Sequence, residues 1–96
     1  MSRAAPRSFS IALEQLAARL APRTTLAEVQ AVWEQAAGPA IAAAASPTAE
    51  RDGVLTVTCA AATWAQELDL MALPLIARLN AEVGREAVRE LRCRTG

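Results

Sequence analysis

Apolar residues recur along this chain at two different spacings, which predict a mixture of helices and strands. Between residues 9 and 20 they are three or four positions apart, as on one face of a helix. The same spacing returns over residues 26–37. From residue 54 to residue 60 they instead alternate with threonine, as in a strand that has one buried face.

The helix over residues 25–37 carries signals at both ends. Thr25 and Glu28 have the spacing of a capping box, in which Glu28 reaches back to the cap residue. Gly38 is expected to end the helix in a left-handed conformation, and Pro39 to prevent it from continuing.

Asp52–Gly53 is a strong hairpin signal between two short strands. The first strand is predicted over residues 47–51, where Pro47 restricts it to an edge or an entry position. The second is predicted over residues 54–60. We interpret the alanine-rich residues 41–45 as the exit of the preceding helix or the approach to the first strand.

Two consecutive helical segments and a last strand are predicted for the remainder of the chain. A helix begins within residues 61–63, and Pro74 is expected to break it near residues 72–73. A further helical segment ends at Gly84. Over residues 88–94 apolar residues alternate with arginine, which predicts a terminal strand with a basic outer face.

This order predicts an α+β fold: a small three-stranded mixed sheet, with helices packed on one face and an additional N-terminal helix. We expect a frayed terminus over residues 1–8 and a single domain over residues 9–94. The order α-β-β-α-α-β is that of the type II K-homology fold, which binds single-stranded nucleic acid. That fold has a GxxG clamp between its consecutive helices, where residues 70–74 contain no glycine.

Two tryptophans are the largest side chains of a chain that is 53% hydrophobic but only 3% aromatic. An indole buries far more area than an alanine-rich face, so both are expected to pack inside the domain. The predicted core residues are Trp33, Leu55, Val57, Trp64, Leu68 and Leu79.

The composition argues against an enzyme. Histidine is absent, which removes the commonest general base and metal ligand, and there is no glycine-rich phosphate loop. Cys59 and Cys93 are too far apart in sequence for a metal knuckle, so we interpret them as small core residues in a reducing compartment. We therefore expect no catalytic residues, no metal and no cofactor.

No apolar run has signal-peptide or membrane-spanning length, which predicts a cytoplasmic protein without membrane contact.

The ten basic residues, all arginine, balance ten acidic ones. A net charge of zero argues against nucleic-acid binding by bulk electrostatics alone. One hypothesis is that the arginines of the last strand and the hairpin contact phosphates locally. The favoured alternative is an ordinary solvated face, because Glu86 and Glu90 lie among these arginines. The candidate nucleic-acid-binding residues are Arg51, Arg85, Arg89, Arg92 and Arg94.

A pattern distributed over residues 9–94 resembles the DciA family. Its most specific part is the Gly-x-Leu-x-Val strand that begins at Gly53, followed by Trp-Ala-Gln-Glu-Leu from Trp64. The other matching positions are Trp33, Gly38, Ile41, Ala42, Pro47, Asp52, Leu79, Asn80 and Gly84.

The resemblance implies a bacterial protein that associates with the replicative helicase DnaB and promotes its loading on single-stranded DNA when replication starts. It also implies a K-homology-like fold without the clamp glycines. The predicted function is thus a non-enzymatic replication factor with DnaB as its main partner and weak contact to single-stranded DNA. The alternative is a general single-stranded nucleic-acid-binding module of K-homology type with no helicase role. The oligomeric state stays open.

Overall fold

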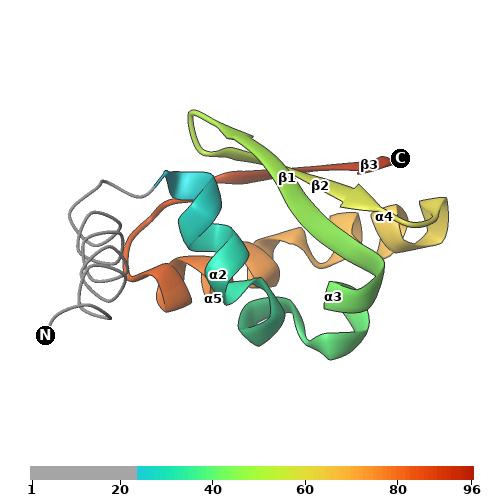
Figure 1. The fold of residues 1–96 in the computed structure, drawn as a ribbon, viewed down its shortest axis with the longest axis horizontal. Coiled ribbons are helices and arrows are strands. Elements are labelled where there is room, and N and C mark those ends of the chain that lie inside the picture. Colours follow the sequence, from blue (N-terminus) through green and yellow to red (C-terminus); the bar gives the residue numbers. More distant parts are fainter. Residues whose placement is uncertain (1–23) are drawn as a thin grey trace, which may run out of the picture.

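The computed structural model describes residues 24–96 (Figure 1). The predicted frayed terminus and the predicted helix over residues 9–20 lie outside this range. The elements, in chain order, are α2 (Thr25–Ala37), α3 (Pro39–Ala44), β1 (Ala45–Arg51), β2 (Val54–Cys59), α4 (Ala62–Leu70), α5 (Ala72–Val83) and β3 (Glu90–Thr95).

The three strands form one mixed sheet in the order β1-β2-β3. β1 and β2 are antiparallel, and β2 and β3 are parallel because α4 and α5 form the connection between them. This arrangement confirms the predicted α+β class and the predicted order of elements, and it is consistent with a small K-homology-like fold.

The helices lie on one side of the sheet (Figure 1). Burial along β2 follows this arrangement: Leu55, Val57 and Cys59 are buried toward the helices, whereas the side chains that alternate with them are only partly buried. The opposite face of the sheet is not covered by any helix of residues 24–96 (Figure 1). This uncovered face, which we call the open face, is where the arginines of β3 lie.

The core fills the space between the sheet and the helices. Trp33, Leu55, Val57, Leu68 and Leu79 are buried there. The fully buried side chains also include Val29, Leu75 and Val88. Trp64 packs against this core but stays partly exposed.

The two tryptophans therefore have different roles. The indole N–H of Trp33 donates a hydrogen bond of 2.8 Å to the carbonyl of Ala45 and joins α2 to the edge strand β1. Gln30, one helical turn earlier, donates to the carbonyl of Pro47 at 3.1 Å. Because these side chains occupy two carbonyls of β1, they protect part of this edge from pairing with another strand.

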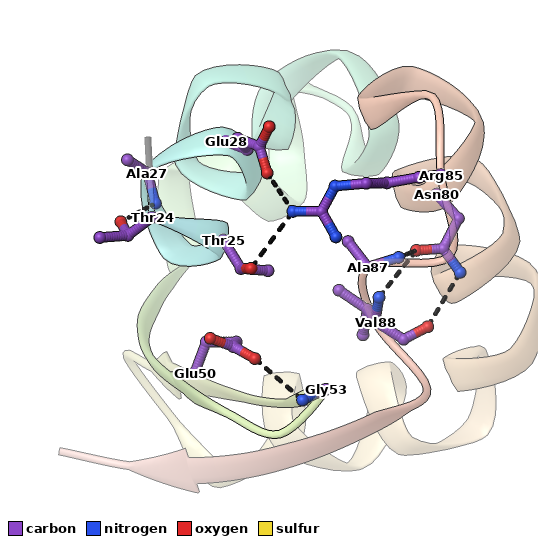
Figure 2. A network of polar contacts seen from close by, with 10 residues as sticks. All are labelled: Thr24, Thr25, Ala27, Glu28, Glu50, Gly53, Asn80, Arg85, Ala87 and Val88. Atoms are coloured by element: carbon purple, nitrogen blue, oxygen red, sulfur yellow. Dashed lines mark hydrogen bonds and ion pairs between the residues drawn. The ribbon is translucent and has the colours of Figure 1, made fainter. Parts of the chain in front are cut away.

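The start of α2 differs from the prediction by one residue. Thr24 is the N-cap, because its backbone is extended and its side-chain hydroxyl accepts the N–H of Ala27 at 3.0 Å. Glu28 does not complete a capping box; it forms an ion pair with Arg85 instead (Figure 2). The prediction failed because Thr24 and Thr25 are consecutive. The sequence pattern does not show which of the two has the extended backbone of an N-cap.

The prediction at the end of α2 was also wrong in detail. Gly38 has φ 93° and ψ 159°, an extended conformation with positive φ rather than the left-handed helical one. Pro39 does not stop helix formation but begins α3, since the first residue of a helix needs no N–H donor. Residues 41–44 are therefore helical, and β1 begins at Ala45, two residues earlier than predicted.

The hairpin forms as predicted. Asp52 and Gly53 have φ values of 52° and 85°, and a two-residue turn with two positive φ values matches the right-handed twist of the strands. The N–H of Gly53 donates to the carboxylate of Glu50 at 2.8 Å (Figure 2). The register of β1 shifts between Pro47 and Ala49, which leaves one residue of β1 without a partner in β2.

The helical pair breaks at Met71, one residue before the predicted position. Pro74 is tolerated as the third residue of α5, because the N–H groups of the first turn have no partner inside the helix. α5 ends at Gly84 as predicted, and this residue is left-handed, with φ 93° and ψ 13°.

Asn80 fixes the loop between α5 and β3 (Figure 2). Its side-chain oxygen accepts the N–H groups of Ala87 at 2.9 Å and Val88 at 2.8 Å, and its amide donates to the carbonyl of Val88 at 2.8 Å. Residues 88 and 89 consequently belong to this loop, and β3 begins at Glu90 rather than at residue 88.

Candidate nucleic-acid interface

A groove of about 520 Å³ lies on the open face of the sheet, beside the hairpin. It contains three of the five arginines that the sequence singled out: Arg51, Arg89 and Arg92. The complete lining consists of Ala49, Glu50, Arg51, Asp52, Val54, Thr56, Arg89 and Arg92.

Strand pairing brings these arginines together. Arg51 on β1 is opposite Val54 on β2, which in turn pairs with Glu90 on β3. In the next row Thr56 of β2 pairs with Arg92. Residues in neighbouring strands lie about 5 Å apart, so one groove can hold side chains from both edges of the sheet.

Arg89 reaches the groove by crossing the hairpin turn. Its backbone N–H donates to the carbonyl of Gly53 at 2.9 Å, and its side-chain Nε donates to the carbonyl of Asp52 at 2.9 Å. A Cβ atom on Gly53 would lie 2.9 Å from the Cγ of Arg89. The absence of a side chain at Gly53 therefore allows Arg89 to lie against the turn.

The groove is only weakly basic. Its three arginines are accompanied by two carboxylates, those of Glu50 and Asp52. The carboxylate of Glu50 is already engaged by the N–H of Gly53. Such a site can contact a phosphate through guanidinium groups, but it does not have the concentrated charge of a strong nucleic-acid-binding groove.

Arg94 and Arg85 lie outside the groove. Arg94 is on the same open face, one row beyond Arg92, and it pairs with Thr58 of β2. Arg85 follows α5, and its guanidinium bonds to Glu28 and, at 3.3 Å, to the hydroxyl of Thr25 (Figure 2). The structure thus groups four of the five arginines on one face and directs Arg85 to the start of α2.

The position of the missing GxxG clamp is apolar. Leu70 and Leu73, which flank the break between α4 and α5, are 85% and 79% exposed. Sequence reasoning missed this feature, although a signal was present: Leu70 falls outside the stripe formed by Trp64, Leu68 and Met71. A second hollow of about 390 Å³ is lined nearby on α4 by Thr63, Trp64 and Glu67.

The two cysteines are free thiols inside or beside the core. Burial, followed by the negative charge and a hydrogen bond of Asp69, raises the pKa of Cys93 to about 12. Burial and then the charge of Asp69 also raise the pKa of Cys59. Both thiols stay protonated near neutral pH, so neither is an activated nucleophile.

Within residues 24–96, no group of three or more histidine, cysteine or acidic side chains is placed to hold a metal ion. Among the same residues, no helix combines the length and apolar character that crossing a bilayer requires.

The sequence model of the family described as "Dna[CI] antecedent, DciA" matches residues 8–93. The chain belongs to the DciA family. Membership supports a replication role related to DnaB at the level of the family. It also agrees with the pattern of glycine, leucine and tryptophan residues from Gly53 to Leu68, which contribute to the hairpin, β2 and α4.

Curated proteins similar to this chain come from species of Rhodococcus, Mycobacterium and Mycolicibacterium and carry the name UPF0232. One, from Rhodococcus jostii, is 38% identical over 71 residues, which is 74% of this chain and 38% of that protein. Another, from Mycobacterium tuberculosis, is 36% identical over 89 residues, which is 91% of this chain and 48% of that protein. The chain thus spans less than half the length of these DciA-family relatives.

Proposed function

We propose that this chain is a non-enzymatic DNA-replication factor that binds the replicative helicase DnaB and assists its loading on single-stranded DNA. The observation that carries this proposal is membership of the DciA family, whose model matches residues 8–93. Protein contact is the main interaction in this proposal, and DNA contact is the weaker one.

The open face supports the DNA part of the proposal. Arg92 and Arg94 are two residues apart on β3, which places them about 7 Å from one another along the strand. With Arg51 and Arg89 they form a set that we call the arginine face. Guanidinium groups spaced in this way suit successive phosphates of an extended single strand.

The same face explains why DNA binding should be weak. Proteins that hold single strands tightly combine basic grooves with aromatic side chains on which bases stack. Both tryptophans of this chain belong to the helices, so the open face of the described residues offers no stacking platform. We therefore expect binding that is sensitive to salt and indifferent to sequence.

A salt titration tests the arginine face. The affinity of the chain for a labelled oligothymidylate is measured by fluorescence anisotropy at several salt concentrations. Each lost phosphate contact lowers the slope of log affinity against log salt by about 0.7, so Arg92→Glu combined with Arg94→Glu should flatten it by roughly 1 to 1.5. Arg85→Gln, which removes a charge away from the face, is the control. An unchanged slope in the double variant would eliminate the face as a DNA contact.

A second experiment separates the helicase role from the alternative. The K-homology-like order of elements favours a general single-stranded nucleic-acid-binding module as the second candidate. The affinities of the chain for its cognate DnaB and for the oligonucleotide are compared at moderate salt, followed by helicase loading with and without the chain. Tight helicase association with weak DNA binding supports the proposal, and the reverse order of affinities supports the alternative.

A further inference from the structure

The junction of α4 and α5 exposes two large apolar side chains. Leu70 is 85% exposed and Leu73 is 79% exposed. They are the exposed large hydrophobic residues among residues 24–96. Single exposed leucines are common on protein surfaces. Two of them at one break, next to a hollow, form a patch that a binding partner can cover.

Helical geometry places Leu70 next to the hollow. Thr63, Glu67 and Leu70 are spaced i, i+4 and i+7, so they share one side of α4. The hollow of about 390 Å³ is lined by Thr63 and Glu67 together with Trp64, whose indole is partly exposed there. The N–H of Met71 bonds to the carbonyls of Glu67 and Leu68, at 3.2 Å each, and closes α4, and Leu73 is the second residue of α5 beyond this break.

The charge of this surface has one sign. Between Arg51 and Arg78 the chain contains no basic residue, and the charged residues of α4 are Glu67 and Asp69. Both are exposed and neither forms an ion pair within the described part of the chain, but Asp69 lies against the thiol of Cys93, so Glu67 is the carboxylate on the side of Leu70. A complementary partner must therefore supply apolar side chains for the leucines and positive charge for Glu67.

We propose that Trp64, Glu67, Leu70 and Leu73, which we call the corner surface, bind a basic amphipathic segment of a partner protein. Leucines and the indole would hold the apolar side chains of that segment, and Glu67 would pair with a lysine or arginine at its rim. The proposal rests on the proposed function in one respect: DnaB is the first partner in which this segment is sought.

Other occupants fit the same chemistry less well. Nucleic acids and anionic lipid surfaces carry negative charge, which Glu67 repels. A second copy of this chain could offer its arginine face, but within residues 24–96 that face carries no large exposed apolar side chain to meet the leucines. A basic segment with apolar side chains can contact the leucines and pair with the carboxylate of Glu67.

The test compares variants of the full chain in binding to cognate DnaB by calorimetry. Leu70→Ser with Leu73→Ser should weaken binding by about tenfold or more, because apolar anchors dominate such contacts. Glu67→Gln should weaken it severalfold at low salt and by less at high salt. Gln35→Ser, at an exposed position of α2 outside both surfaces, is the control and should bind as the unaltered chain does. Thermal unfolding midpoints equal to that of the unaltered chain would show that the variants fold.

The outcomes distinguish this inference from the proposed function. If the unaltered chain and the serine variant bind DnaB equally, the corner surface is wrong and the helicase role stands. If the unaltered chain does not bind DnaB, the helicase role fails, and a synthetic amphipathic peptide of leucine and lysine then tests the surface. Its addition should shift the amide resonances of residues 63–73 in the unaltered chain but not in the serine variant. Shifts elsewhere, or none, would overturn the inference.

Discussion

The hairpin and the junction of α4 and α5 are built and charged differently. Hydrogen bonds hold the hairpin: Glu50 binds the N–H of Gly53, and Arg89 binds the carbonyl of Asp52. At the helical junction, α5 begins after Met71 without a side-chain cap. The hairpin carries arginines, whereas α4 carries carboxylates beside exposed leucines.

This difference shows why a net charge of zero says little about binding. The ten positive and ten negative charges are not mixed evenly, since no basic residue occurs between Arg51 and Arg78. Four arginines gather on the open face of the sheet. A chain that is neutral overall can therefore offer a basic surface to DNA and a separate acidic, apolar surface to a protein.

The largest expected effect comes from the two sides of α4. Leu68 is fully buried and Leu70 is 85% exposed, although they are two residues apart. Leu68→Ala should lower the free energy of unfolding by about 2–5 kcal/mol, because it leaves a cavity in the core. Leu70→Ala should change it by less than about 0.5 kcal/mol. Urea unfolding measures both values, and equal destabilisation would show that Leu70 is part of the core rather than of a binding surface.

Asn80→Ala should have the next largest effect. The substitution leaves the N–H groups of Ala87 and Val88 without their acceptor, and we expect a loss of about 2–4 kcal/mol in the free energy of unfolding. Gln35→Ala, at an exposed position of α2, is the control. Amide hydrogen exchange should become faster at residues 87 and 88 than elsewhere in the chain. A loss no larger than that of the control would mean that Asn80 does not hold this loop.

Gly53→Ala should cost about 1–3 kcal/mol for two reasons. Its φ of 85° is unfavourable for alanine, and the new Cβ would lie 2.9 Å from the Cγ of Arg89. A double-mutant cycle with Arg89→Ala separates the two causes, since truncating Arg89 removes only the collision. If the loss is the same in both backgrounds, backbone conformation is the whole cause and Arg89 does not lie against the turn.

Alkaline pH should lower stability through Cys93. The thiol of Cys93 has a pKa raised from 9.0 to about 12 in the folded chain, so the folded state keeps its proton more strongly than the unfolded state does. The resulting stabilisation is complete below about pH 9 and is lost as the pH rises toward 12. Urea midpoints at several alkaline pH values should therefore fall less steeply for Cys93→Ala than for the unaltered chain. Identical slopes would contradict the pKa shift.

Much of the fold could be predicted because local signals and tertiary structure agree. Asp52–Gly53 specifies a turn with two positive φ values, and the alternation over residues 54–59 matches a strand that has one buried face. Gly84 ends α5 for an equally local reason. These features needed no knowledge of distant contacts.

The remaining details depend on contacts between segments that are far apart in sequence. Glu28 was assigned to its own helix, but it pairs with Arg85, 57 residues later. Trp33 and Trp64 look equivalent in sequence, yet only Trp33 finds a buried carbonyl acceptor, that of Ala45. A helical stripe predicts that a side chain meets the core, but it does not give the depth of burial.

The arginines illustrate the same limit for the candidate site. Their spacing in sequence grouped Arg85 with Arg89, whereas the loop held by Asn80 separates the two. Arg51 joins the groove only through the pairing of β1 with β2 and of β2 with β3. The sequence therefore supplied the candidate residues, and the sheet register determined which of them meet.

Separate binding by the two surfaces is the central claim, and one set of affinities tests it most directly. The unaltered chain, the Arg92→Glu/Arg94→Glu variant and the Leu70→Ser/Leu73→Ser variant are each titrated against the oligothymidylate and against cognate DnaB. We predict that the arginine variant loses DNA binding and retains helicase binding, and that the leucine variant does the opposite. Loss of both activities in both variants, or of neither in either, would contradict two separate surfaces.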